Sequence, residues 1–308
     1  MTLRRKLALV AGLYFVEGFP MGVYADVWPV FLRDSGLSRT AIGFLSGIGF
    51  AWSVKALWAP LLDRYGEWRR WIACALVAMA LATLAVPGLA AGAGPALVAA
   101  AIAAFCLASA TQDVAIDAYA VGLTDAGEEG PLSAVRVTAY RLGKLAFGAG
   151  ALVAADALGW GLTHQAIAAA TLLFALGVLA APRVQPAAPE RFHWREALGS
   201  LRRPELKGAL AFLLVYRIGD LAIAPMIGPF WRDSGMSLTQ IGTFSTGLSA
   251  LVGIAGAAAG GWIVARSLAG ALTVGGVLSA LSNVFYALAA WVGAPFGWMV
   301  AASFAESF

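Results

Sequence analysis

Residues 31–46 read FLRDSGLSRTAIGFLS, and residues 230–245 read FWRDSGMSLTQIGTFS. Ten of the 16 positions are identical at a constant shift of 199 residues. Each copy lies where one apolar segment ends and the next one begins. Two loops that had converged by chance would not share this identity at equivalent places, so the sequence predicts two halves that repeat each other.

The composition is that of a protein that crosses a membrane several times. Of the 308 residues, 60% are hydrophobic and 12% are charged, whereas soluble globular domains carry about 25% charged residues. Stretches of roughly 20 apolar residues are long enough to span a bilayer. We expect such spans at residues 8–31, 41–62, 71–90, 96–123, 133–156, 164–181, 208–231, 239–263 and 268–291.

The repeat sets the expected domain boundaries of this all-α chain. Residues 1–181 form a six-helix half, residues 182–207 a cytoplasmic linker, and residues 208–308 an incomplete second half. A tenth apolar segment begins near Phe296 and has 13 residues, which are too few to cross a bilayer. At the shift of 199, Phe308 corresponds to residue 109, so we expect a truncated reading frame or a fragment that ends in its tenth helix.

The loop cations predict the orientation, because cytoplasmic loops are enriched in Lys and Arg. The formal charge of +4 follows from this placement and gives no argument for nucleic-acid binding. We expect a membrane protein with a cytoplasmic amino terminus. Thirteen cations fall on the cytoplasmic side (Arg4, Arg5, Lys6, Arg64, Arg69, Arg70, Arg183, Arg191, Arg195, Arg202, Arg203, Lys207 and Arg266), and three fall on the other (Arg33, Arg39 and Arg232).

Two carboxylates lie deep inside the fourth predicted span, where residues 109–119 read SATQDVAIDAY. Asp113 and Asp117 are four residues apart and therefore share one face of a helix. An aspartate at the bilayer centre costs roughly 2.5–3.5 kcal/mol on insertion scales. These two side chains must therefore face protein partners, water or a solute.

Further charges fall at the same depth of the predicted spans, from the midplane into the cytoplasmic half. Some of them are open to a purely structural interpretation, since ion pairs can fix helix register, and Arg217 and Asp220 are close enough to satisfy each other. For the set as a whole, a solute and ion pathway is the default in a membrane interior. The set comprises Glu17, Asp113, Asp117, Asp220, Lys55, Arg141, Lys144 and Arg217.

These residue types suggest two roles. A carboxylate that loses its cationic partner to an anionic solute takes up a proton, which would couple solute movement to proton movement. An Arg guanidinium can grip a carboxylate or phosphate with two hydrogen bonds, whereas a Lys ammonium acts as a point charge. The candidate proton carriers are Glu17, Asp113, Asp117 and Asp220, and the candidate solute-binding residues are Lys55, Gln112, Tyr119, Arg141, Lys144 and Arg217.

Residues 59–70, APLLDRYGEWRR, resemble the signature between the second and third helices of the major facilitator superfamily. Two six-helix halves in parallel orientation are also the plan of that superfamily. The first Gly of the signature is Ala59 here, and Glu67 and Trp68 precede the final arginines. The resemblance implies gating roles for Asp63, Arg64, Arg69 and Arg70. In the corresponding loop of the second half, Ala265 stands where the Asp is expected.

A narrower resemblance is to the AmpG family of muropeptide permeases, whose motifs are shared with acetyl-coenzyme A transporters. It is carried by LWAPLLDRY at 57–65, ATQDVAIDAY at 110–119, YRLG at 140–143 and LSN at 281–283. It implies proton-coupled import of anhydromuropeptides, with Asp113 and Asp117 as the intramembrane acidic motif. Alternatives are transport of another anion, such as an acyl-coenzyme A or a peptide, and a facilitator-fold protein that does not transport.

Other classes of function find little support in the sequence. The two cysteines, Cys74 and Cys106, lie in apolar segments and suggest neither a disulfide nor a metal site. His164 and His193 are too few for a metal site, and no nucleophile–base pair or phosphate-binding loop stands out. We therefore expect a monomeric transporter of a small anionic solute and protons in the lipid bilayer, with no metal, no cofactor and no enzymatic activity.

Overall fold

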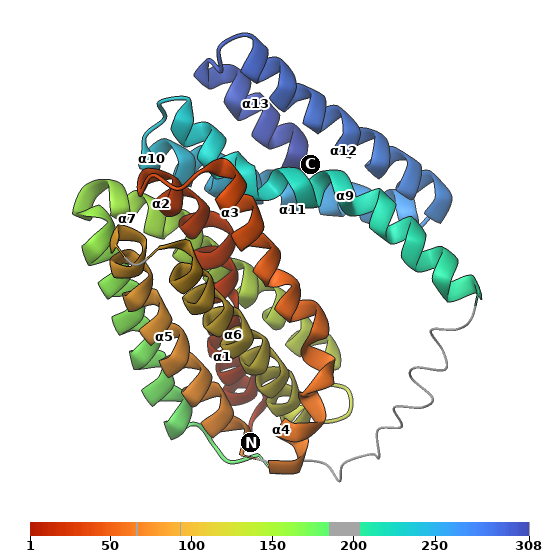
Figure 1. Ribbon diagram of the computed structural model, residues 1–308. Coiled ribbons are helices and arrows are strands. Elements are labelled where there is room, and N and C mark those ends of the chain that lie inside the picture. Colours follow the sequence, from red (N-terminus) through yellow and green to blue (C-terminus); the bar gives the residue numbers. More distant parts are fainter. Residues whose placement is uncertain (66, 93, 185–203, 308) are drawn as a thin grey trace. The chain divides into compact units, whose positions relative to one another are not determined.

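The computed structural model describes residues 1–65, 67–92, 94–184 and 204–307, and every regular element in these ranges is a helix. The chain divides into two compact units, residues 1–189 and 190–308, which are coloured red to green and cyan to blue in Figure 1. Most of the linker predicted at 182–207 lies outside the described residues. The all-α class predicted from the sequence is confirmed.

The first unit is a bundle of long helices (Figure 1). The first predicted span is nearly continuous but changes helix type midway, where the π-helix η1 follows Pro20. Helix α1 packs along α7, and α5 packs on both α6 and α7. The elements are α1 (Leu3–Met21), η1 (Gly22–Val27), α2 (Trp28–Asp34), α3 (Arg39–Ser46), η2 (Gly47–Leu57), α4 (Ala59–Tyr65), α5 (Trp68–Gly92), α6 (Pro95–Leu123) and α7 (Glu129–Ala180).

Three predicted spans differ in detail from the structure. Residues 41–62 are not one regular helix, because Gly47–Leu57 is a 3₁₀-helix between two α-helical pieces. The spans 133–156 and 164–181 both belong to α7, which is interrupted at Gly159. Gly159 has a φ of 80°, a conformation that glycine adopts without steric cost, so the chain reverses there with no loop between the two helices.

Glycines let α1 and α7 approach to backbone contact. A Cβ at Gly18 would overlap the backbone of Tyr140, and one at Gly143 would overlap the carbonyl of Phe15. Gly22 likewise lies against the backbone of Lys144 and Gly148. Small residues at such positions are the usual means of close helix packing in a membrane. We call this contact between α1 and α7, at Gly18, Gly22 and Gly143, the glycine seam. It fixes how the polar side chains of the two helices face one another.

The second unit repeats the local structure of the first where the sequence repeats. Ser35 and Ser234 each donate a side-chain hydrogen bond to the carbonyl four residues earlier, at 2.9 Å and 2.8 Å. Gly36 and Gly235 follow with φ of 88° and 82°. The elements of this unit are α9 (Pro204–Asp233), α10 (Leu238–Gln240), the π-helix η3 (Ile241–Leu248), α11 (Ser249–Val264), α12 (Leu268–Trp291) and α13 (Phe296–Ser307).

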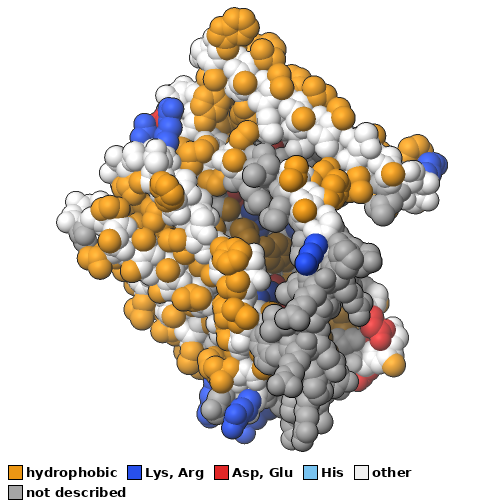
Figure 2. Space-filling view, turned by 45° about the vertical axis from the view of Figure 1, so that its right-hand side comes forward, with side chains coloured by type: hydrophobic (Ala, Val, Ile, Leu, Met, Phe, Trp, Pro, Cys, Tyr) orange, Lys and Arg blue, Asp and Glu red, His pale blue; other side chains and the backbone are white. Residues whose placement is uncertain are grey.

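The outer surface is apolar, as expected for contact with lipid. Figure 2 shows hydrophobic side chains over much of the visible surface, and large ones such as Leu81, Leu107 and Leu173 are exposed. Seven helical stretches among the described residues are long and apolar enough to cross a membrane: Leu3–Asp34, Arg39–Leu57, Trp68–Gly92, Pro95–Leu123, Glu129–Ala180, Leu238–Gly256 and Leu272–Trp291.

Candidate functional site

Asp117 on α6 is held by two partners from neighbouring helices. The Tyr14 hydroxyl of α1 donates to Asp117 Oδ1 at 2.6 Å, and Arg136 Nη2 of α7 donates to the same oxygen at 2.7 Å. The Arg136 guanidinium also lies 4.6 Å from the centre of the Tyr14 ring, a cation–π distance. Three helices therefore meet at one carboxylate.

Asp113 lies one helical turn before Asp117 and has a different partner. Lys55 Nζ, from the 3₁₀-helix η2, is 3.5 Å from Asp113 Oδ2. The Asp113 side chain is 14% exposed and the Lys55 side chain 35%. This ion pair is longer than a good hydrogen bond, so each group retains some capacity for another partner.

Glu17 on α1 completes the group. Its Oε2 atom is buried and has no hydrogen-bond partner among the described residues. The charges that act on it are those of Asp113, Asp117, Lys55 and Arg136. We call these residues, together with Tyr14, the inner cluster. It contains three carboxyl groups and two cations, so one carboxyl group has no compensating charge within the cluster.

The two cations predicted to act together on α7 lie in different environments. Lys144 Nζ is 4.0 Å from Asp26 Oδ2 of η1. Arg141 is exposed, and the described residues offer it no ion pair. The structure therefore brings Lys144 to an acidic partner that the sequence analysis did not include and leaves Arg141 outside the inner cluster.

The two polar α6 residues predicted to bind solute are both buried. The Gln112 amide is fully buried, and its oxygen and nitrogen have no hydrogen-bond partner among the described residues. The Tyr119 hydroxyl donates to the carbonyl of Pro182 at 2.8 Å. Tyr119 thus contacts the chain that follows α7 and not the inner cluster.

Of the four predicted gating residues, Arg69 binds the end of α7. Arg69 Nη1 donates to the carbonyls of Leu179 and Ala181 at 3.0 and 2.6 Å, which satisfies groups left unpaired at a helix C-terminus. Glu67 forms an ion pair with Arg70 and lies 3.5 Å from Arg183. Arg64 is exposed. The side chains of Asp63, Arg217 and Asp220 lie outside the described residues.

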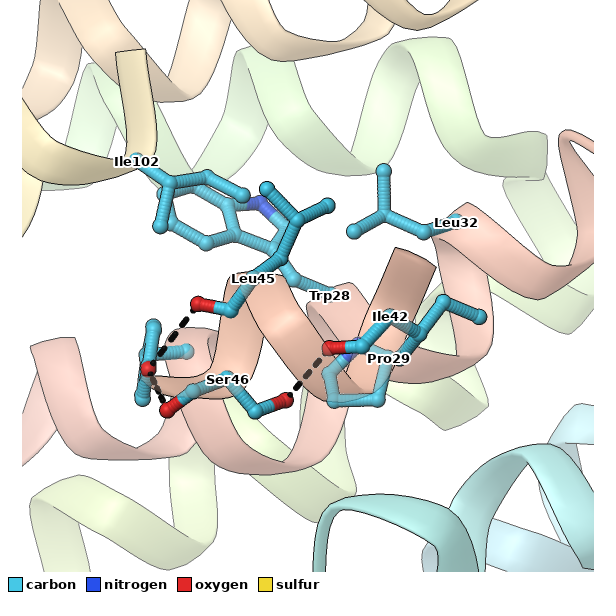
Figure 3. Close-up of a pocket in the computed structure, with 8 residues that line it drawn as sticks. Trp28, Pro29, Leu32, Ile42, Leu45, Ser46 and Ile102 are labelled. Carbon is cyan, nitrogen blue, oxygen red and sulfur yellow. Dashed lines mark hydrogen bonds between the residues drawn. The ribbon is translucent and has the colours of Figure 1, made fainter. Parts of the chain in front are cut away.

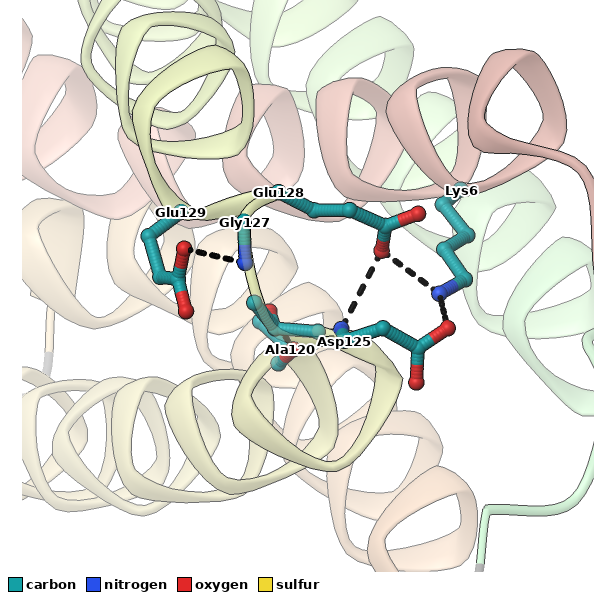
Figure 4. Close-up of polar contacts among 7 residues, drawn as sticks. Lys6, Ala120, Asp125, Gly127, Glu128 and Glu129 are labelled. Carbon is teal, nitrogen blue, oxygen red and sulfur yellow. Dashed lines mark hydrogen bonds and ion pairs between the residues drawn. The ribbon is translucent and has the colours of Figure 1, made fainter.

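A second ionic group, which we call the end cluster, joins the ends of α1, α6 and α7. Lys6 Nζ contacts Asp125 and is 2.6 Å from Glu128 Oε2 (Figure 4). Glu128 also accepts a hydrogen bond from the Asp125 amide at 3.1 Å. The hydrogen bonds from Lys6 lower the pKa of both carboxyl groups below their usual values. All three charges of this cluster are paired.

The pocket in Figure 3 is apolar and lies apart from both clusters. Trp28, Leu45 and Ile102 line it together with Tyr24, whose hydroxyl accepts a hydrogen bond from the Gly49 amide at 2.7 Å. No charged side chain lines this pocket. We read it as a packing gap that the Tyr24 hydroxyl closes at the start of the 3₁₀-helix.

The sequence analysis missed Tyr14, Asp26 and Arg136 as members of ionic groups. Arg136, Tyr140 and Lys144 recur every four residues, a spacing that places them on one helix face and marks Arg136 as a companion of Lys144. Asp26 lay inside the predicted span 8–31 and was a further intramembrane acid. Among the described residues, no three His, Cys, Asp or Glu side chains are placed to hold a metal ion.

Residues 10–308 match the sequence profile of the Major Facilitator Superfamily. The anhydromuropeptide permease of Escherichia coli strain K12 is 30% identical over 296 residues, which cover 92% of this chain and 60% of the permease. A protein of Haemophilus influenzae with no described function is 30% identical over 274 residues, covering 82% of this chain and 64% of that protein. The chain thus spans less than two thirds of the length of either relative.

Solved structures share the fold. A bacterial homologue of the human lysosomal transporter Spinster, in an inward-facing and occupied conformation, aligns with a TM-score of 0.69 and 15% sequence identity. The alignment covers 98% of this chain and 71% of that protein.

Proposed function

The chain belongs to the major facilitator superfamily. We propose that it imports anionic anhydromuropeptides across the bacterial cytoplasmic membrane and that proton flow into the cell drives this import. It is a multi-pass membrane protein, and the amino terminus is proposed to be cytoplasmic. The identity to the Escherichia coli permease suggests the solute. The charge balance of the inner cluster suggests the coupling.

The inner cluster is the observation that carries the proposal. With Glu17, Asp113 and Asp117 ionised against Lys55 and Arg136, it holds one net negative charge in a membrane interior, where an uncompensated charge is costly. One bound proton removes that charge. Glu17 is the proposed acceptor, because its buried Oε2 has no hydrogen-bond partner in the part of the chain that the structure describes, whereas Asp113 and Asp117 each have a cation.

The same cluster offers a route by which solute and proton movement depend on each other. A carboxylate of the solute that binds Arg136 or Lys55 takes a cation from Asp117 or Asp113. The carboxylate left behind then favours protonation. Arg141, which is exposed on the same helix as Arg136, is proposed to extend the positive surface that meets the solute. Gln112 is proposed to contribute through its unpaired amide.

Arg69 is the proposed link between the gate and the rest of the unit. It joins the first turn of α5 to carbonyls at the end of α7, and Arg70 neutralises Glu67 just before α5. A movement of the start of α5 would therefore move the end of α7. We propose that Asp63 and Arg64, in the preceding helix α4, act together with this contact.

Uptake measurements in cells that lack their own permease test this proposal. Labelled anhydromuropeptide should accumulate, and a protonophore should abolish accumulation. The Glu17→Gln variant should still let the solute equilibrate across the membrane but should no longer accumulate it. The protonophore should therefore have no effect on uptake by this variant. Glu129→Gln is the matched control, because Glu129 is an exposed carboxylate in the first turn of α7 and should behave as the unchanged protein does.

Two outcomes would count against the proposal. Protonophore-sensitive uptake that survives unchanged in Glu17→Gln would remove Glu17 from the proton pathway. An absence of uptake, with the protein shown to be in the membrane, would exclude anhydromuropeptides as the solute. Uptake of a labelled acyl-coenzyme A or a labelled peptide would then identify another anionic solute.

A further inference from the structure

Asp26 and Lys144 form an ion pair that is separate from both clusters and incomplete. Their closest atoms, Oδ2 and Nζ, are 4.0 Å apart, beyond the 2.7–3.2 Å of a normal hydrogen bond. Asp26 Oδ2 is buried and has no hydrogen-bond partner among the described residues. The Lys144 side chain is 42% exposed. The carboxylate is thus enclosed and the ammonium accessible.

The backbone holds Asp26 at this place. Asp26 lies in η1, and π-helical turns shift the direction of the side chains that follow and often mark functional positions. Gly148 on α7 lies directly opposite, and a Cβ there would meet the Asp26 carboxylate. The carboxylate therefore occupies a space that Gly148 leaves open, one turn beyond Lys144.

This pair lies well away from the inner cluster. Asp26 follows Glu17 by nine residues, or about 13 Å along a helix at 1.5 Å per residue. Lys144 follows Arg136 by eight residues, or about 12 Å by the same rise. The continuous segment α1–η1 and the helix α7 thus contribute charged groups at two levels along the helix axis. Only the inner cluster is used in the function proposed above.

We propose that Lys144 is a second binding position for a carboxylate of the transported solute and that Asp26 pairs with Lys144 while the solute is absent. The proposal rests on the proposed transport function for the identity of the solute and adds the requirement for a second acidic group. Replacement of one carboxylate by another keeps the charge of Lys144 compensated, and the buried Asp26, which then lacks its cation, favours protonation. An accessible, weakly held ammonium fits that exchange better than a closed structural ion pair does.

The two levels also imply a solute of a certain form. A molecule that contacts Arg136 with one carboxylate and Lys144 with another must bridge backbone positions about 12 Å apart on α7, by the same helical rise. A sugar that bears an acidic peptide stem meets this requirement. A small monocarboxylate reaches one level only.

The lysine signals of the whole chain in lipid nanodiscs can test the exchange. The sequence has four lysines, Lys6, Lys55, Lys144 and Lys207, so ¹³C-dimethylation followed by NMR gives few signals, which Lys→Arg variants assign. Acetate is the first probe because it tests the exchange without assuming the solute. Chloride at equal ionic strength is its control.

Asp26→Asn should shift the Lys144 signal and should raise the affinity of acetate at Lys144 about two- to fivefold, the range expected for loss of a weak competing ion pair. Asp26→Ser should have the same effect, in case the first variant does not fold. Asp125→Asn is the matched control, since it should shift the Lys6 signal and leave Lys144 unchanged. Anhydromuropeptide should then move the Lys144 and Lys55 signals together.

Three results would overturn the inference: a Lys144 signal that does not respond to either Asp26 variant, an acetate affinity that Asp26 does not affect, or a chloride response as large as the acetate response. Failure of the proposed transport function looks different. In that case acetate still competes with Asp26 at Lys144, but anhydromuropeptide moves no lysine signal.

Discussion

The end cluster and the inner cluster both combine carboxylates with cations and differ in how completely these groups are paired. At the helix ends, Lys6 lies between Asp125 and Glu128 and contacts both carboxylates. In the interior, Lys55 is 3.5 Å from Asp113, and the described residues offer Glu17 Oε2 no hydrogen-bond partner. Fully satisfied ionic groups hold structure, whereas partly satisfied ones keep charge available for a solute or a proton.

The largest expected effect is on transport when the inner cluster is changed. Asp117→Asn should weaken the contacts with Arg136 and Tyr14, and hydrogen bonds to charged groups are worth about 1.5–3 kcal/mol, so uptake should fall roughly tenfold to a hundredfold. The measurement is the initial uptake rate of labelled anhydromuropeptide, corrected for the amount of protein in the membrane.

Glu128→Gln is the control for this prediction, because it removes a carboxylate from the end cluster. Uptake by that variant should match the unchanged protein. If both variants lose uptake equally, the distinction between a structural and a functional cluster is wrong.

The second expected effect is on stability and concerns the glycine seam between α1 and α7, two helices that contribute residues to the inner cluster. Gly143→Ala places a methyl group on the Phe15 carbonyl, and overpacking of this kind costs about 1–3 kcal/mol. Gly150→Ala is the matched control on the same helix, because nothing lies within 4 Å of a Cβ there. Thermal unfolding in detergent should show a lower midpoint for Gly143→Ala alone, and equal midpoints would contradict the close approach of α1 and α7.

Much of the fold follows from the sequence because the membrane restricts the choices. The span predicted at 268–291 has the same bounds as α12, and the repeated serines and glycines at 31–46 and 230–245 form the same turn twice. The 3₁₀-helix at Gly47–Leu57 was not predicted; its Gly49 amide donates to the Tyr24 hydroxyl of another helix, and the local sequence pattern does not reveal a contact of this kind.

The site was predictable in part. Asp113 and Asp117 were recognised because two acids four residues apart stand out in an apolar span, and the structure places them beside Glu17 and Lys55. Their partners Arg136 and Tyr14 were missed, since pairing between helices depends on helix rotation and on the glycine seam.

A smaller effect is expected when the end cluster loses its cation. Lys6→Gln leaves Asp125 and Glu128 facing each other without a positive charge, so the unfolding temperature should fall. Uptake at a temperature well below unfolding should not change. The exposed Arg5 gives the matched variant Arg5→Gln, for which neither quantity should change. Loss of uptake in Lys6→Gln before any loss of fold would assign a functional role to the end cluster.

The smallest expected effect is a pH dependence of stability from the same cluster. Hydrogen bonds from Lys6 lower the pKa of Asp125 and Glu128 in the folded protein, so unfolding raises these pKa values and favours proton uptake. Their contribution is therefore complete above the unfolded values of about 4 and is lost as the pH falls through the folded ones. Unfolding midpoints measured from pH 6 down to about pH 3 should converge for the unchanged protein and Lys6→Gln. A difference that stays constant over this range would show that Lys6 stabilises the helix ends by packing and not by its charge.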